Sequence, residues 1–150
     1  MIFVREAHRE DAGKILDFQL LLAQETENRA LDKLIVTKGI KEVFDDPAKG
    51  KYYVAEISGK VVGCLLITYE WSEWRNGNIW WLQSVYVDAS HRKSGVFRKM
   101  YEYIIESING DQTIAGLRLY VENNNSRAQK IYKALGMNGG YYQVFEWFKE

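Results

Sequence analysis

Short runs rich in β-branched and aromatic residues recur along the chain, separated by turn residues. Such runs are typical of β-strands. Ser58-Gly59 and Asn76-Gly77 separate neighbouring runs and predict two turns in this part of the chain. The predicted strands are Ile2 to Arg5, Lys51 to Ile57, Lys60 to Tyr69, Ile79 to Val87, Leu117 to Val121 and Tyr141 to Phe148.

Between these runs, apolar residues recur every three or four positions, which is the period of a helix with one buried face. We expect Asp11 to cap the first helix. Pro47 is a stop signal for the second helix, and Gly136 for the last. The stretch from Gln24 to Arg29 is interpreted as a polar connection. The first predicted helix follows Asp11 and continues to Leu22. The next two span Lys33 to Phe44 and Val96 to Ser107. The last follows Asn123 to Asn125 and runs through Ala128 to Leu135.

The resulting element order is β-α-α-β-β-β-α-β-α-β. Hairpins require antiparallel neighbours, and two helical crossovers in the second half require parallel ones. The sequence therefore predicts an α/β fold with a mixed, mostly antiparallel central sheet and helices on both faces. At 150 residues, the simplest interpretation is a single domain over residues 1–150.

The amino-acid composition disfavours several classes of function. Twenty basic and twenty acidic residues balance, which disfavours nonspecific binding to nucleic acid driven by overall charge. The single cysteine, Cys64, excludes an intramolecular disulfide and is expected to pack in the core. No His/Cys cluster indicates a metal, and no run reaches the length of a membrane helix. The start lacks a secretory signal, so we expect a cytoplasmic protein with no membrane partner.

The strand ending at Val87 is followed by small residues, by the basic stretch His91 to Lys93, by Gly95 and by a helix. The first N–H groups of a helix lack partners within it, and the helix dipole favours an anion there. This arrangement predicts a phosphate site. An ordinary strand-to-helix turn with a solvated basic rim remains the alternative.

The stretch Arg92 to Phe97 resembles the Gln/Arg-x-x-Gly-x-Gly/Ala motif of the GCN5-related N-acetyltransferases. The resemblance implies the fold of that family, in which this loop holds the pyrophosphate of acetyl-coenzyme A and the preceding strand pairs with its pantetheine arm. Phe97 departs from the family's Gly or Ala, although its backbone N–H can still serve. The implied coenzyme contacts here are Val85, Tyr86, Val87, Arg92, Lys93, Ser94, Gly95, Val96 and Phe97.

A second resemblance lies in the stretch Asn125 to Tyr132, which is similar to the family's Asn-x-x-Ala-x-x-x-Tyr pattern. It implies that Asn125 contacts the coenzyme and that Tyr132 protonates the leaving thiolate as a general acid. A phenol with a pKa near 10 suits that task. The alternatives are a helix cap at Asn125 or Asn124, and a Tyr132 that only packs on the sheet.

The general base is not carried over by the resemblance, because Gln83 stands where polyamine acetyltransferases have Glu. Glu70 is the first substitute; Glu25, Glu73 and Glu122 are weaker ones, and a water relay is a further option. Acidic groups near aromatic residues can hold a cationic amine. We therefore expect Glu25, Glu27 and Glu73 to bind the acceptor, although a solvated surface role competes for each.

These observations predict an acetyl-coenzyme A-dependent N-acetyltransferase. It would act by direct transfer to a primary amine, with a small molecule as the favoured acceptor over a peptide or protein. A non-catalytic acyl-coenzyme A-binding module is the alternative, and a nucleic-acid-binding domain resting on His91 to Lys93 is disfavoured by the neutral charge. Only one strand is predicted after Gly136, where the family commonly has two, so a homodimer through the C-terminal strand is one way to complete the sheet.

Overall fold

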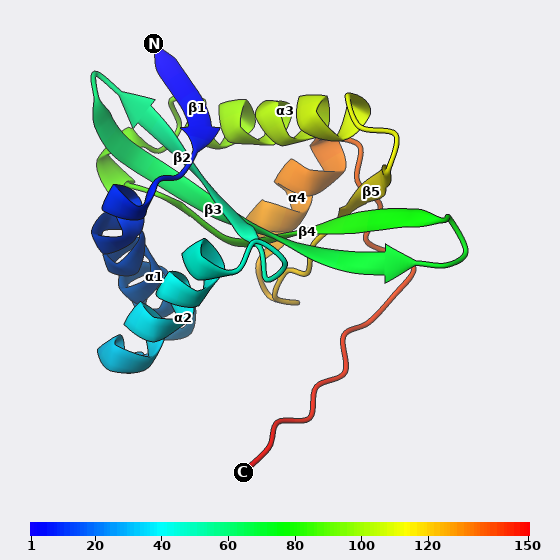
Figure 1. The fold of residues 1–150 in the computed structure, drawn as a ribbon, viewed down its shortest axis with the longest axis horizontal. Helices are drawn as coiled ribbons and strands as arrows, with labels where there is room; N and C mark the ends of the chain where they lie inside the picture. The colour runs from blue at the N-terminus through cyan, green and yellow to red at the C-terminus, as the bar shows by residue number, and fades with distance from the viewer. The chain divides into compact units, whose positions relative to one another are not determined.

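The computed structural model describes all 150 residues as two compact units, residues 1–118 and residues 119–150. The first unit contains the whole sheet and three of the four α-helices, and the second contains the last helix (Figure 1). The elements are β1 (Ile2–Glu6), a 3₁₀ turn (Arg9–Asp11), α1 (Ala12–Glu27), α2 (Lys33–Asp45), β2 (Lys51–Ile57), β3 (Lys60–Ser72), β4 (Gly77–Val87), a second 3₁₀ turn (Ala89–His91), α3 (Val96–Asn109), β5 (Ile114–Arg118) and α4 (Ser126–Ala134).

The sheet has five strands in the order β1-β2-β3-β4-β5. The first three pairings are antiparallel, and β4 pairs with β5 in parallel. The parallel pairing is reached by a crossover through α3, as the pattern of the sequence requires. The predicted α/β fold with a mixed, mostly antiparallel sheet is confirmed.

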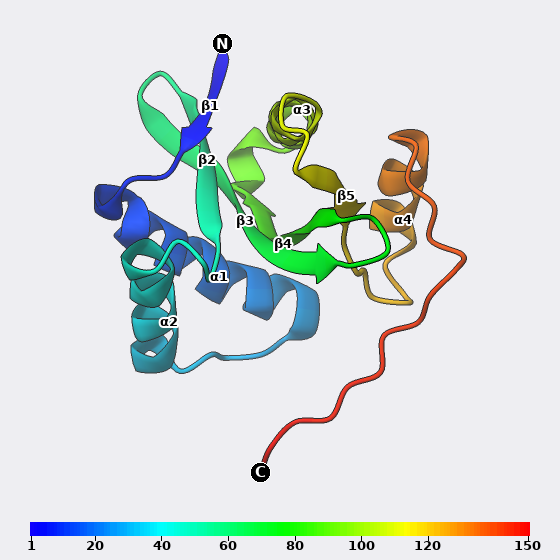
Figure 2. The same cartoon turned by 45° about the vertical axis from the view of Figure 1, so that its right-hand side comes forward.

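Helices cover both faces of the sheet in the first unit (Figure 2). On one face, Ile15 and Phe18 of α1 and Ile40 of α2 form the core with alternate residues of the strands, including Val54 and Tyr86. On the other face, Tyr103 of α3 packs on Tyr53, with ring centroids 5.8 Å apart. The alternation of neighbouring side chains in β2 thus supplies both layers.

Gly63 of β3 sets how closely α3 approaches the sheet. A Cβ at this position would lie 3.1 Å from the carbonyl oxygen of Tyr86 and 3.2 Å from Cγ1 of Val96. The buried side chains of Val96 and Met100 occupy this space instead. The start of α3 is therefore anchored directly beside the end of β4.

The boundaries of β5 and α1 differ from the predicted ones by several residues. β5 was expected at Leu117 to Val121 but spans Ile114–Arg118, because Asp111 caps the preceding turn through Thr113 and the strand begins directly after it. α1 continues through the predicted polar connection to Glu27. It ends at Asn28, whose left-handed conformation (φ 48°) is one that Asn tolerates at a helix terminus.

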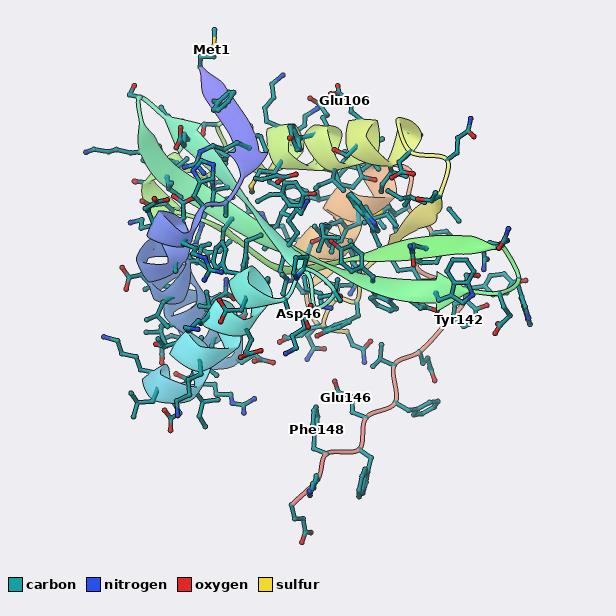
Figure 3. The ribbon with its side chains drawn as sticks, viewed as in Figure 1. Met1, Asp46, Glu106, Tyr142, Glu146 and Phe148 are labelled. Carbon is teal, nitrogen blue, oxygen red and sulfur yellow. The ribbon has the colours of Figure 1, made fainter.

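In the second unit, Asn125 caps α4 by accepting a hydrogen bond from the N–H of Ala128 at 3.0 Å. The cap is therefore Asn125 and not Asn124. The strand predicted at Tyr141 to Phe148 is wrong for this structure, since these residues form neither helix nor strand and are exposed (Figure 3). A strand needs a neighbour for its backbone groups, and this segment is paired with none.

No helix of the structure is both long enough and apolar enough to cross a membrane.

Candidate functional site

β4 is paired on both sides along only part of its length. Its residues Asn78 to Trp81 pair with β5, whereas the ladder with β3 continues as far as Val87. From Leu82 to Val87, the edge of β4 on the β5 side therefore has no strand partner. β5 ends at Arg118, which pairs with Trp81, so beyond this point the main-chain groups on that edge of β4 have no strand neighbour.

A β-bulge lies within this unpaired half. Cys64 pairs with Tyr86 and Leu66 pairs with Gln83, so that Leu65 alone opposes both Ser84 and Val85. Ser84 has a φ of 53°, in the left-handed region that a non-glycine residue rarely adopts. Bulges redirect peptide groups and often lie beside functional sites. This bulge turns the peptide groups around Val85 within the unpaired edge.

The loop after β4 combines two left-handed residues with the start of a helix. Lys93 has a φ of 62° and Gly95 a φ of 87°, and Gly95 is the N-cap residue of α3. The first intrahelical bond runs from the N–H of Lys99 to the carbonyl of Gly95 at 3.0 Å. Amides of the first turn that precede this bond have no acceptor within the helix. Alternating right- and left-handed residues gather such amides into an anion-binding concavity.

Side chains on either side of this loop pack against the fold. Val96 is buried beneath the helix, and the ring of Phe97 packs along α3 on Tyr101, with centroids 6.1 Å apart. Tyr86 is also buried, and its ring lies 5.1 Å from that of Phe18 on α1. Among the predicted coenzyme contacts, Tyr86 and Val96 can therefore contribute only backbone groups.

Arg92 extends back toward β4 and α1. Its Nε donates to the carbonyl of Val87 at 2.9 Å, and its Nη2 donates to both carboxylate oxygens of Glu25 at 2.9 and 3.2 Å. Its guanidinium also lies 5.2 Å from the centre of the Tyr86 ring. Arg92 and a hydrogen bond from Tyr86 lower the pKa of Glu25. Glu25, which was expected to bind the acceptor, thus already has two partners.

Glu70 is part of an ion-pair cluster across three strands. Its carboxylate accepts from Nε1 of Trp81 at 2.8 Å and from Nη1 of Arg118 at 3.0 Å. These donors lower its pKa, the bond from Trp81 most of all. Glu70 pairs with Ile79, and at about 3.3 Å per residue Ile79 lies roughly 20 Å along β4 from Val85. Both the pairing and the position argue against Glu70 as a direct base for chemistry near Val85.

The other predicted acceptor residues lie apart from one another. Glu27 is the exposed last residue of α1. Glu73 lies in the turn between β3 and β4, at the opposite end of β4 from the left-handed loop. Gln83 lies closer to the unpaired edge, where its Nε2 donates to Thr68 Oγ1 at 2.5 Å. The structure therefore does not bring Glu27 and Glu73 together.

Asn125 and Tyr132 both belong to the second unit, one as the cap of α4 and the other on its second turn. Burial raises the pKa of Tyr132 above the usual value for a phenol. A raised pKa keeps the hydroxyl protonated at neutral pH, as a proton donor must be.

Sequence reasoning missed two features of the site. The left-handed Ser84 gave no signal, because a serine in a strand-like run carries no mark of its backbone angle. The partnership of Arg92 with Glu25 joins residues 67 positions apart. Glu25 was also assigned to a loop, so its place on the face of a helix was not considered.

Comparison with known proteins agrees with this geometry. The chain matches the acetyltransferase (GNAT) family over residues 15–137 and belongs to it. It is 30% identical over 143 residues to a thialysine N-epsilon-acetyltransferase from Bos taurus, covering 90% of this chain and 83% of that protein. The predicted family is thus confirmed.

The fold of this chain is also similar to those of solved acetyltransferase structures. A possible acetyltransferase from Clostridium difficile 630 superposes with a TM-score of 0.94 at 43% identity, covering 100% of this chain and 99% of that one. A glucosamine-6-phosphate N-acetyltransferase from Arabidopsis thaliana shares the fold at 20% identity, with a TM-score of 0.73 and 99% of both chains covered.

Proposed function

We propose that this chain is an acetyl-coenzyme A-dependent N-acetyltransferase. It acts on the primary amine of a small molecule by direct transfer in a ternary complex. The observation that carries the proposal is the length of β4 that continues beyond the end of β5, from Leu82 to Val87, and leads directly into the left-handed loop that begins α3. Because the family match runs from residue 15 to residue 137, across both compact units, we further propose that residues 1–150 work as one domain.

The residues present fit the coenzyme. Main-chain amides from Arg92 to Phe97 would hold the pyrophosphate, with Lys93 and the dipole of α3 adding positive potential. The unpaired edge at Val85 and Val87 would pair with the amide groups of the pantetheine arm. When bound, the coenzyme supplies an activated acetyl thioester. Main-chain amides around the bulge at Ser84 would stabilise negative charge on its carbonyl oxygen.

Tyr132 is the proposed general acid, and Asn125 a contact to the coenzyme arm. Acetyl transfer forms a bond between nitrogen and the carbonyl carbon and breaks the bond from that carbon to sulfur. The leaving thiolate then accepts the phenolic proton of Tyr132. The hydroxyl of Tyr132 is protonated at neutral pH, as a proton donor must be, although burial raises its pKa and makes it a weaker acid than a free phenol.

The acceptor amine must be neutral when it attacks. Glu70 was the first candidate base, but its contacts with Trp81 and Arg118 reduce its proton affinity. If Glu70 accepts the proton of the amine, it would do so through a chain of water molecules. That chain would begin at the polar side chains of Glu70, Thr68 and Gln83 on one face of the sheet. The thialysine acetyltransferase named among the relatives suggests amines carried on a flexible side chain as the first acceptors to try.

The test is an assay of free thiol released from acetyl-coenzyme A in the presence of a panel of small primary amines that includes thialysine, lysine and polyamines. Thiol release that depends on an amine, together with an acetylated product of the expected mass, supports the proposal. A protein that binds coenzyme A but produces no thiol with any amine, and is indifferent to Tyr132→Phe, is instead an acyl-coenzyme A-binding module. The paired state of Glu70 and the amide at Gln83 favour that second function.

We also propose a homodimer in which the segment from Tyr141 to Phe148 adds to the edge of β5 in a second copy. β5 pairs only with β4, so its other edge has no strand neighbour. Most of the apolar side chains in the segment are more than half exposed, up to 90% for Phe145. Main-chain pairing with burial of aromatic residues is a common mode of association.

Sedimentation of the full chain tests this interface. The wild type should sediment as a dimer and Phe145→Asp with Trp147→Asp as a monomer. A wild-type monomer would contradict this interface. Fractionation of cells that express the tagged chain tests the cytoplasmic location that we propose with this function.

A further inference from the structure

A cluster of side chains joins the end of α1 to the loop that begins α3. It consists of Glu25, Tyr86 and Arg92. The two charged residues are 67 positions apart in sequence, and their side chains remain 38% and 41% exposed. The pair is thus neither a local helix contact nor a core feature. It holds two elements together at the edge of the proposed coenzyme site.

Contacts among the three side chains fix the position of the Arg92 guanidinium. Arg92 donates to the carbonyl of Val87, the last residue of β4, and so spans the turn from strand to loop. Its guanidinium lies over the ring of Tyr86, which is buried against Phe18 of α1. The hydroxyl of Tyr86 is hydrogen bonded to Glu25. The guanidinium is therefore fixed on three sides by β4 and α1.

The contacts of Arg92 distinguish two possible roles, which are direct binding of phosphate and support of the loop. A guanidinium that binds phosphate directly must point toward the ligand, and that of Arg92 points to Glu25 and Val87. The residue after it, Lys93, is held in the left-handed region. Anchoring Arg92 on one side fixes where the following left-handed turn and the first amides of α3 lie. Fixing them before the ligand arrives reduces the entropy that binding costs.

We propose that Glu25 is a positioning residue for coenzyme binding, which acts by holding Arg92 and thereby preorganises the phosphate-binding loop. This inference rests on the proposed function and deepens it. It also changes the expected role of Glu25, from a ligand of the acceptor amine to a support of the coenzyme loop.

The experiment measures the affinity for coenzyme A by calorimetry, and the Michaelis constants for acetyl-coenzyme A and for the amine. The variants are Glu25→Gln, Arg92→Ala and the double variant. We expect Glu25→Gln to weaken coenzyme binding about fivefold, the upper range for a partly exposed ion pair. The constant for the amine should stay unchanged. In the Arg92→Ala background, Glu25→Gln should have no further effect, since its partner is gone.

The matched control is Glu42→Gln, which removes an ion pair of similar exposure between α2 and Lys49. It should leave both constants unchanged. The inference is overturned if Glu25→Gln raises the constant for the amine and spares coenzyme affinity, which would restore the acceptor role. It is also overturned if the effects of Glu25→Gln and Arg92→Ala simply add.

Hydrogen exchange in the absence of any ligand separates failure of this inference from failure of the proposed function. Glu25→Gln should speed exchange of the amides from Lys93 to Lys99, whereas Glu42→Gln should not. Faster exchange in a protein that does not bind coenzyme A would preserve the loop-holding role and reject the function. Unchanged exchange in a protein that does bind it would reject the loop-holding role alone.

Discussion

The two halves of β4 have the same kind of sequence but different surroundings. From Asn78 to Trp81 the strand is paired on both sides, and Trp81 is held by Glu70. From Leu82 to Val87 it is paired only with β3, contains a bulge and leads into a left-handed loop. The doubly paired half stabilises the sheet, and under the proposed function the singly paired half would offer backbone groups to the coenzyme. The two roles would then be set by where the strand is paired and not by its residue types.

The largest expected effect comes from placing a charge in the loop after the singly paired half. Gly95→Glu puts negative charge at the phosphate site and forces a side chain into a φ of 87°. We expect affinity for coenzyme A to fall about a hundredfold by calorimetry. Gly59→Glu is the matched control, since Gly59 is also left-handed (φ 77°) with open space around it, but lies in the turn between β2 and β3. Equal losses in both variants would place the phosphate elsewhere.

The next effect concerns proton transfer. Tyr132→Phe should lower turnover about a hundredfold, within the usual range for loss of a general acid, while coenzyme affinity changes little. Tyr103→Phe, which removes a hydroxyl from the face of α3 that packs on Tyr53, is the control and should retain turnover. A loss of affinity with normal turnover would make Tyr132 a binding residue.

Substitutions at the bulge test whether the backbone of the singly paired half of β4 is needed for coenzyme binding. Ser84→Val should lower the free energy of unfolding by about 1 kcal/mol, because a β-branched residue resists the left-handed region more than serine does. It should also weaken coenzyme binding, whereas Ser84→Gly should preserve binding. Ser58→Val, at a φ of 51° in the turn between β2 and β3, should cost similar stability without affecting the ligand. Normal binding by Ser84→Val would separate the bulge from the site.

The smallest effect is expected in the doubly paired half. Glu70→Gln should lower the free energy of unfolding by about 0.5 kcal/mol at neutral pH, because the ion pair with Arg118 is partly exposed and screened. Turnover should change little.

The pH dependence of this difference follows from the lowered pKa of Glu70. The hydrogen bond from Trp81 and the ion pair with Arg118 stabilise the fold above the ordinary carboxyl pKa of 4.5, and this contribution is lost as pH falls through the lower folded pKa. Denaturant titrations of both proteins should therefore converge in acid. A hundredfold loss of turnover in Glu70→Gln would instead restore Glu70 as the base.

The sequence predicted the parts of the fold that depend on side-chain pattern. The span of α3 from Val96 and the hairpin at Ser58-Gly59 follow from apolar period and turn residues, and both are present. The segment from Tyr141 to Phe148 has strand composition, yet it forms no strand in this structure because composition does not supply a neighbour to pair with.

The site was predictable only in part for the same reason. The motif from Arg92 to Phe97 marks the loop, and α3 begins at Val96 as predicted, but the left-handed angle of Lys93 had no signal in the sequence. The bulge at Ser84 and the end of the pairing at Trp81 are properties of the backbone that no residue type encodes. Long-range partners such as Arg118 for Glu70 also require the sheet order before they can be named.

The packing of Phe97 along α3 has a consequence for how this site can evolve. A ligand gripped by peptide groups places few demands on side chains, so the loop can exchange most of its residues while its dihedral angles persist. Proteins with divergent loop sequences could then still bind the same coenzyme, and a search for a sequence motif at this position would miss them. The backbone torsion angles at the positions of Lys93 and Gly95 would therefore identify proteins with the same function better than the residue types at these positions.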